Sequence, residues 1–223
     1  MKTKIKLSAF KEIVPLFFIF WAVIIGVGVF MAPCIPDQIP THWNTQGQID
    51  GYSSKPMAVF LLLGVLVAMY LLMLFLPHLD PLKKNYKEFE KPYYILRLAL
   101  IIFFVSLYVF TLLAAAGYKL DIKKFIIPSM SLLFIVFGVL MPKIKRNYFV
   151  GIRTPWTLHS DEVWLKTHKL GGWTFAGAGI LCFFTLWLGD WAFAIFMVII
   201  LLAALLPIVY SYLEYKKLGL FKH

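Results

Sequence analysis

The chain has 223 residues, of which 61% are hydrophobic and 15% are charged, with a mean hydropathy of +0.81 and a formal net charge of +11. A water-soluble domain of this length could not bury so much apolar side chain, which excludes the soluble globular class. The composition instead predicts an all-α integral membrane protein whose apolar surface is solvated by a bilayer.

Six apolar runs are long enough to cross about 30 Å of hydrocarbon as helices. They lie at approximately residues 13–32, 57–76, 95–116, 125–141, 170–188 and 191–213. The first run follows four lysines but is too long for the apolar region of a signal peptide, so we expect an uncleaved span. Gly189-Asp190 leaves room only for a tight turn between the last two runs, which predicts a helical hairpin.

Lysine and arginine are distributed unevenly between the two sides of these six spans. Eighteen of the 22 lie at the N-terminus, after the second and fourth spans and in the C-terminal tail. The other side holds only Lys55, Lys119, Lys123 and Lys124. The positive-inside rule therefore places both termini in the cytoplasm. Because this asymmetry accounts for the net charge, we expect no direct nucleic-acid binding.

The middle of each run contains no Asp, Glu, Lys or Arg, each of which would cost about 2.5–3.5 kcal/mol there. Pumps and many transporters keep such residues as ion sites or proton relays. A transporter or extruder of a small or lipid-like molecule nevertheless stays open, because backbone at helices broken by Pro128 or Pro207 would also bind ions. Glycine and alanine are frequent in the fifth run, which predicts close helix packing.

Residues 33–56 form the one substantial outer loop, and their prolines and turn residues predict an ordered segment. Trp43 and Tyr52 suit either specific contacts or the aromatic belt at the membrane interface. A lone His42 has no second ligand at metal-binding spacing, so we expect no metal and no cofactor. The loop has a slight negative charge, which allows a cationic peptide as a partner.

The inner loop, residues 142–170, contains the densest set of informative residues: PKIKRNYFVGIRTPWTLHSDEVWLKTHKL. Ser160, followed by two acidic residues, predicts the start of a helix that continues into the fifth span. On that helix Trp164 and His168 are four residues apart and would share a face. The chain lacks HExxH, GxSxG and a carboxylate pair in a span, so we expect no enzyme. A membrane enzyme with a polar cluster around His42, His159 or His168 is the alternative.

Two interpretations of the inner loop are left open by its residues. In one, Arg153 and the lysines hold anionic lipid headgroups while Trp156 and Trp164 anchor the membrane interface. In the other, the loop is a docking surface for a cytoplasmic partner, with the Arg153 guanidinium as a hydrogen-bonding fork and the tryptophans as anchors.

Both loops resemble a known family. Residues 147–172, NYFVGIRTPWTLHSDEVWLKTHKLGG, look like the signature of the SdpI-like bacterial immunity proteins, and residues 39–56, IPTHWNTQGQIDGYSSKP, resemble the N-terminal module often found before it. The inner candidate recognition residues are Asn147, Gly151, Arg153, Thr154, Pro155, Trp156, Thr157, Trp164 and His168. The outer ones are Ile39, Pro40, His42, Trp43, Asn44, Gly47, Asp50, Gly51, Tyr52 and Lys55, of which His42, Asp50 and Tyr52 are chosen for their chemistry.

This resemblance implies a multi-pass protein of the bacterial plasma membrane with two modules, residues 1–92 with two spans and residues 93–223 with four. The family's best-known member gives resistance to a secreted peptide toxin and holds a cytoplasmic repressor at the membrane, and the resemblance implies the same roles here. We therefore expect an immunity or signal-receptor protein. Its partners would be the lipid bilayer, a peptide toxin at the outer loop and a repressor at the inner loop.

Overall fold

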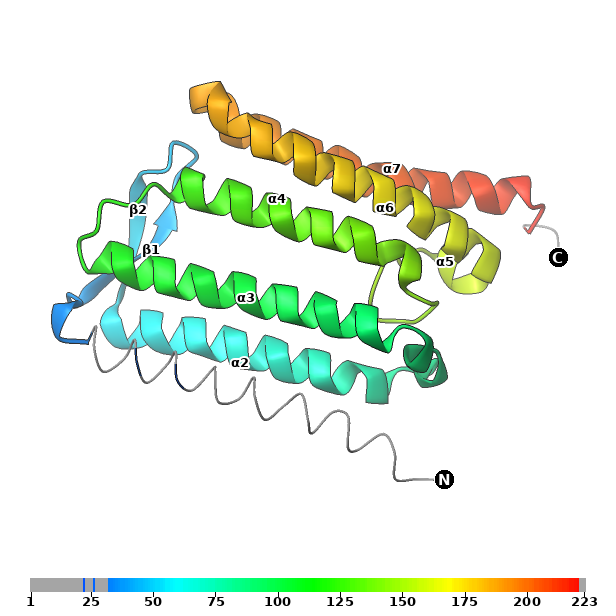
Figure 1. Ribbon diagram of the computed structural model, residues 1–223, viewed down its shortest axis with the longest axis horizontal. Helices are drawn as coiled ribbons and strands as arrows, with labels where there is room; N and C mark the ends of the chain where they lie inside the picture. The colour runs from blue at the N-terminus through cyan, green and yellow to red at the C-terminus, as the bar shows by residue number, and fades with distance from the viewer. Residues whose placement is uncertain (1–21, 23–25, 27–31, 221–223) are drawn as a thin grey trace.

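The computed structural model describes residues 22, 26 and 32–220. The predicted first span, residues 13–32, therefore lies almost entirely outside the described residues. The long helices run side by side along one axis of the molecule (Figure 1). They are α2 (Lys55–Leu79), α3 (Glu90–Ala115), α4 (Ile122–Leu140), α6 (Asp161–Phe184) and α7 (Ala192–Lys217). Short helices connect them: η1 (Ala32–Cys34), η2 (Lys83–Glu88), η3 (Met141–Lys143), α5 (Pro155–His159) and η4 (Thr185–Trp191).

Four helical stretches of the described chain are long and apolar enough to cross a membrane. Three are α2, α3 and α4 with η3, and the fourth extends over 57 residues from Asp161 to Lys217. This last stretch folds back on itself, because Gly189 in η4 has φ 58° and ψ −123°, and α6 and α7 consequently lie side by side (Figure 1). The chain reverses where Gly189-Asp190 predicted it. Six spans with cytoplasmic termini remain a prediction.

The prediction of an all-α protein is incomplete, because the outer loop forms a two-stranded antiparallel sheet. Strand β1 (Gln38–Trp43) pairs with β2 (Ile49–Ser54). The turn between them depends on Asn44, whose Oδ1 accepts hydrogen bonds from the backbone N–H of residues 46 and 48 at 3.0 and 2.9 Å. Gly47 in this turn has φ 82°, a conformation that glycine adopts without strain. Turn chemistry was recognised in the sequence, but the strand pairing was not.

The β-hairpin is seated on the ends of α2 and α3. Ile39 is fully buried in a cluster with Tyr108 and Leu112 of α3 and Ala58 of α2. Lys55, the first residue of α2, donates its backbone N–H to Asp37 at 2.8 Å. The hairpin therefore has a fixed position on the helices.

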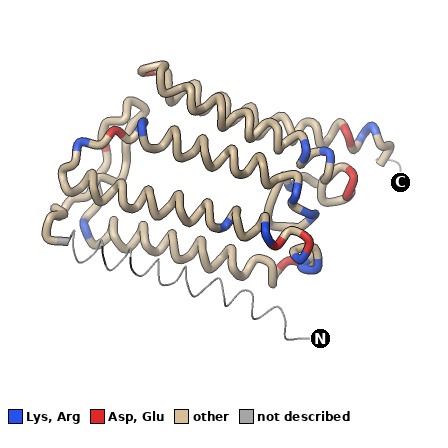
Figure 2. Tube along the Cα trace, viewed as in Figure 1, with Lys and Arg blue, Asp and Glu red and all other residues tan. Residues whose placement is uncertain are grey.

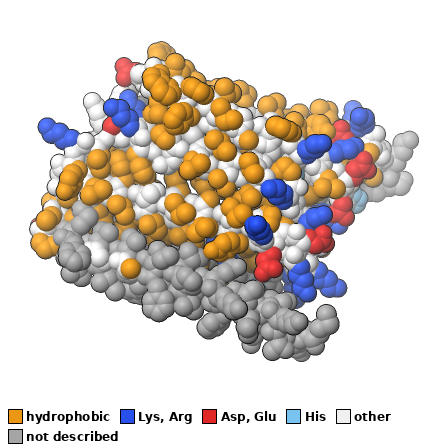
Figure 3. All heavy atoms as spheres, in the orientation of Figure 1, with side chains coloured by type: hydrophobic (Ala, Val, Ile, Leu, Met, Phe, Trp, Pro, Cys, Tyr) orange, Lys and Arg blue, Asp and Glu red, His pale blue; other side chains and the backbone are white. Residues whose placement is uncertain are grey.

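Charged residues of the described chain gather at the two ends of the helices, and the surface between them is largely apolar (Figures 2 and 3). We call the end with η2 and α5 the basic end and the end with β1 and β2 the hairpin end. The basic end holds Lys83, Lys84, Lys87, Lys91, Lys143, Lys145, Arg146, Arg153, Lys166, Lys169, Lys216, Lys217 and, two turns into α3, Arg97. The hairpin end holds Lys55, Lys119, Lys123 and Lys124. The charge separation behind the predicted orientation is thus present in the structure.

The helices α4 and α7 continue through their internal prolines, Pro128 and Pro207. A broken helix exposes backbone groups that can bind ions, and such a break at either position would have favoured the transporter alternative. The structure has no break at these two prolines.

Helices α4 and α6 approach each other backbone to backbone. A Cβ atom added to Gly138 of α4 would lie 2.4 Å from the backbone nitrogen of Ala176 and 2.6 Å from the carbonyl oxygen of Gly172. One added to Gly179 would lie 2.6 Å from the carbonyl oxygen of Ser131. The predicted close packing of the small residues in the fifth span is therefore confirmed.

We predict that Gly138→Ala lowers the free energy of unfolding by about 1–3 kcal/mol, because the new methyl group must push two backbones apart. Gly177→Ala is the matched control, since a Cβ at Gly177 meets nothing within 4 Å. Thermal unfolding of the purified protein in detergent measures both variants. Equal stability of Gly138→Ala and the native chain would show that α4 and α6 are not held this close.

Candidate functional site

The inner loop is folded against the basic end and contains a capped short helix. Thr154 starts α5: its Oγ1 accepts the backbone N–H of Thr157 at 3.2 Å, and the Thr157 Oγ1 accepts the N–H of Thr154 at 2.9 Å. Pro155 fits the first turn, because the backbone N–H that proline lacks would have no partner within the helix at this position. The Thr154 hydroxyl also lies 3.0 Å from the Ser211 hydroxyl of α7. The Thr-Pro-Trp-Thr sequence thus caps a helix and fixes it to α7.

Asn147 shapes the turn that precedes α5. Its Oδ1 accepts backbone N–H groups of Phe149 and Val150 at 2.9 and 2.6 Å. Its Nδ2 donates to the carbonyls of Lys145 and Val150, both at 2.9 Å. The side chain is fully buried, so these bonds satisfy an amide that water cannot reach. Asn147 is therefore a structural residue of the loop.

Gly151 closes the same turn with φ 111°. A Cβ at this position would lie 2.3 Å from Nε2 of His168, so the close approach of the loop to α6 also requires glycine. This is the reason for a glycine in this position of the signature.

Trp164 and His168 stack on one face of α6, as their spacing predicted, with ring centroids 3.9 Å apart. The indole Nε1 donates to the Ile144 carbonyl at 2.8 Å. The imidazole Nε2 accepts the backbone N–H of Ile152 at 3.1 Å, so Nδ1 carries the proton and donates to the Trp164 carbonyl at 2.9 Å. The histidine is therefore neutral in this arrangement and connects the loop to α6.

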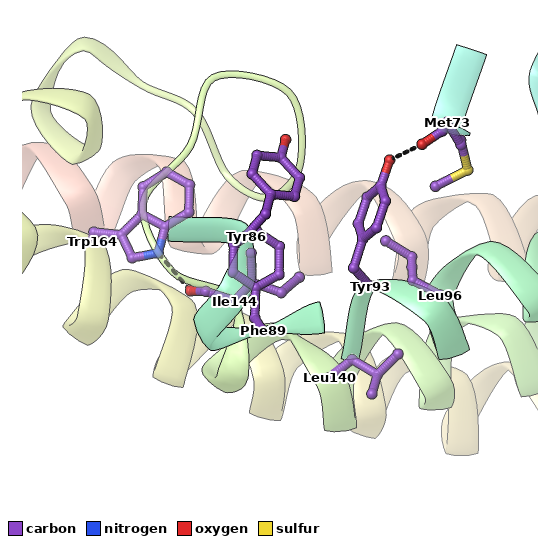
Figure 4. Packing of buried hydrophobic residues seen from close by; sticks show 8 residues of the cluster. All are labelled: Met73, Tyr86, Phe89, Tyr93, Leu96, Leu140, Ile144 and Trp164. Carbon is purple, nitrogen blue, oxygen red and sulfur yellow. Dashed lines mark hydrogen bonds between the residues drawn. The ribbon is translucent and has the colours of Figure 1, made fainter. Parts of the chain in front are cut away.

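Trp164 also belongs to the apolar cluster that joins the loop to the helices (Figure 4). Tyr86 and Phe89 lie beside it, and Tyr93 of α3 donates its hydroxyl to the backbone carbonyl of Met73 in α2. Trp164 and His168 are each only 1% exposed. They hold the loop in place and present no surface to a partner in this conformation.

Asp80, directly after α2, is a central residue of the site that the sequence analysis missed. It is 2% exposed, and its carboxylate accepts the backbone N–H of Leu82 at 2.7 Å and of Tyr148 at 2.9 Å. The Tyr86 hydroxyl donates to the same carboxylate at 3.1 Å. Burial, and secondly this carboxylate, raise the pKa of Tyr86 well above its usual value, so the phenol keeps its proton. The available signal was a lone acidic residue at the end of an apolar run.

Four accessible residues of the inner loop lie between positions 148 and 156, and we call this group the 148–156 face. Its members are Tyr148, Arg153, Pro155 and the half-buried Trp156. Arg153 donates from Nη1 to the Tyr148 carbonyl at 2.8 Å, and Trp156 packs edge-on against Tyr212 with ring centroids 5.2 Å apart. Of the predicted inner recognition residues, only Gly151 and members of this face are accessible. Asn147, Thr154, Thr157, Trp164 and His168 are buried.

The predicted outer residues divide in a similar way. Ile39, Pro40, Trp43 and Lys55 hold the hairpin, with Trp43 edge-on to Phe110 at 6.1 Å between ring centroids and Lys55 Nζ donating to the Ile35 carbonyl at 3.0 Å. Asn44, Gly47 and Gly51 shape its backbone. His42, Asp50 and Tyr52 are exposed, and His42 Nδ1 lies 2.6 Å from Asp50 Oδ1.

The inner and outer loops lie at opposite ends of the helices (Figure 1), so the structure does not bring the two predicted sets together. The described residues contain no group of three or more His, Cys, Asp or Glu side chains placed to hold a metal ion.

We predict that Asp80→Ala loosens the inner loop, because it removes the acceptor of the buried Tyr86 hydroxyl and of the partly buried N–H groups of Leu82 and Tyr148. Loss of the acceptor costs about 1–3 kcal/mol for a buried donor. Trypsin should then cut after Arg146 and Arg153 about tenfold faster or more, since each 1.4 kcal/mol, roughly, multiplies the open population by ten. Glu88→Ala is the control, as it removes an exposed ion pair to Lys145 at the same end. Equal cleavage rates in both variants would contradict the role of Asp80.

Comparison with known proteins finds matches at both loops. Residues 143–211 match the SdpI/YfhL protein family, and residues 19–67 match a domain of unknown function, DUF1648. The chain is 29% identical to Immunity protein SdpI of Bacillus subtilis (strain 168) over 192 residues, which cover 83% of this chain and 87% of that protein. No solved structure matches.

The family match begins at Lys143 and ends at Ser211, so it contains the whole folded inner loop and its contact on α7. The DUF1648 match includes the first part of the chain through the β-hairpin into α2. Together with the similarity along most of the chain, these matches confirm the resemblance seen in the two loops: the chain is similar to DUF1648 over residues 19–67 and to the SdpI/YfhL protein family over residues 143–211.

Proposed function

We propose that this chain is an immunity and signal-receptor protein of the bacterial plasma membrane, giving resistance to a secreted peptide toxin and holding a cytoplasmic repressor at its inner loop. The similarity to Immunity protein SdpI along 83% of the chain supports immunity function at the level of the family. The observation that carries the proposal is the inner loop itself. It is folded by hydrogen bonds and a buried tryptophan within the family segment, yet keeps one accessible face.

The hairpin end offers the surface for the peptide. Tyr52 is 59% exposed and Ile49 is 40% exposed, and both lie on β2 next to the exposed His42–Asp50 pair. Apolar side chains beside a carboxylate suit a peptide that is both cationic and apolar. A two-stranded sheet also has free backbone groups at its edges, to which an extended peptide can add.

The 148–156 face offers the surface for a partner at the basic end. Trp156 supplies an apolar anchor and Arg153 a planar hydrogen-bonding group, which are two residue types that dominate binding energies at interfaces. The face depends on contacts to three other elements, through Asp80, Trp164 and Ser211. A shift of α2 against α6 and α7 would therefore change its shape, which gives ligand binding a route to alter partner binding.

We predict that Arg153→Ala and Trp156→Ala weaken binding of the repressor to the membrane-bound chain about tenfold, the effect of losing one anchor. The assay is the share of repressor that sediments with membranes of Bacillus subtilis that lacks its own Immunity protein SdpI, expresses this chain and meets the peptide toxin of its own strain. Lys143→Ala is the matched control, since it removes an exposed cation from the same end outside the 148–156 face. Full retention of the repressor by both variants at normal membrane abundance would refute the role of this face.

The outer surface is tested by Tyr52→Ala, which removes the one aromatic ring of β2 and leaves the hairpin's buried anchor, Ile39, in place. We expect binding of the toxin to the purified protein to weaken about tenfold, as for loss of an interface anchor. Tyr118→Ala is the matched control, because Tyr118 is 61% exposed and lies at the hairpin end outside the sheet. Equal binding by both variants would place the toxin elsewhere.

A further inference from the structure

A groove of about 500 Å³ lies between α4 and α6 near the basic end, a size within the usual range for ligand sites. Its floor is backbone, since Gly138, Gly172 and Ala176 bring the two helices together there. The groove follows from the same glycine contact that packs α4 against α6. None of the inner or outer recognition residues lines it.

The walls of the groove are apolar side chains that lie largely exposed on the surface of the protein. Trp173 is 72% exposed, Val139 is 54% exposed and Leu165 is 52% exposed. The face of the molecule drawn in Figure 3 is likewise largely apolar between its two charged ends. In a bilayer this surface would contact lipid rather than water.

One end of the groove is cationic. Lys166 and Lys169 line it on the first turns of α6, on the side of the basic end. The Lys166 ammonium lies 2.9 Å from a carboxylate oxygen of Glu162 and 3.0 Å from one of Glu214, so its charge is already compensated. Lys169 is exposed and takes part in none of the ion pairs found among the described residues. Its ammonium is therefore the group that can meet an anion.

Along α6, the cationic Lys169 comes first and the apolar residues of the groove follow it. From Lys169 to Ala176 the helix rises by about 10 Å, with Trp173 between them. An amphiphile in a bilayer has the same order along the membrane normal, with its phosphate at the level of basic residues and its chains deeper. Basic pockets between transmembrane helices are known to bind anionic headgroups.

We propose that this groove binds one anionic phospholipid, with its phosphate against Lys169 and an acyl chain over Gly172, Trp173 and Ala176. The predicted orientation places the basic end in the leaflet that faces the cytoplasm. The bound lipid would lie beside α6 just after Trp164 and His168, which hold the inner loop. The site is separate from the 148–156 face, so its test does not depend on the proposed immunity function.

The test uses the purified full-length chain in detergent and two probes, phosphatidylglycerol and phosphatidylcholine with the same bromine-labelled acyl chains. Bromine quenches tryptophan fluorescence on contact, and comparison with Trp173→Phe isolates the signal from Trp173. We expect phosphatidylglycerol to quench Trp173 at lower concentration than phosphatidylcholine. Lys169→Ala should raise the half-saturating phosphatidylglycerol concentration about fivefold. It should raise that of phosphatidylcholine less, because the choline cation of that lipid offsets the attraction between its phosphate and Lys169.

Lys143→Ala is the matched control, because Lys143 is an exposed lysine at the same end that does not line the groove. It should leave phosphatidylglycerol binding unchanged. If Lys143→Ala and Lys169→Ala weaken phosphatidylglycerol binding equally, the lipid is attracted by the whole basic end, and the proposed site at Lys169 is refuted. Equal half-saturation by the two lipids, or cross-linking that shows a second copy of the chain covering Trp173, would overturn it as well.

Discussion

The backbone contact between α4 and α6 determines where the rest of the basic end can lie. Gly138 and Gly172 allow the two helices to meet without intervening side chains, and α6 then enters the inner loop at a fixed position. From that position Trp164 reaches the Ile144 carbonyl and His168 reaches the Ile152 N–H. A larger residue at the contact would displace both rings, and the loop would lose two of its hydrogen bonds together.

The inner loop is therefore an extension of the packed core. Polar residues of the signature satisfy buried backbone groups, as Asn147 does in its turn and Thr157 does at the start of α5. Asp80 fixes the opposite side of the loop from the end of α2. Interior polar groups with complete hydrogen bonding favour one conformation over others, because any alternative leaves a buried group unsatisfied. The exposed Arg153 and Trp156 are held by this framework.

Much of the fold could be predicted because it depends on local chemistry. The apolar runs, the Ser160 cap of α6 and the reversal at Gly189 need only neighbouring residues to specify them. The β-hairpin was not predicted because its strands are held in place by the packing of Ile39 against residues of α2 and α3, which are distant in the sequence. Asp80 was missed for a similar reason: its partner Tyr148 is 68 positions away in the chain. The burial of Trp164 likewise depends on contacts with η2 and η3, which spacing along one helix does not reveal.

Helix α2 connects the two loops most directly. At its first residue, Lys55 bonds to the backbone of the hairpin segment through both its N–H and its ammonium. Just after its last residue, Asp80 bonds to the inner loop. A helix of 25 residues is about 37 Å long and is stiff along its axis, because each turn is hydrogen-bonded to the next. A ligand that displaces the hairpin along this axis would therefore move Asp80 as well. Since Asp80 accepts the Tyr148 N–H within the 148–156 face, α2 and these hydrogen bonds form a continuous series of contacts from the β-hairpin to that face.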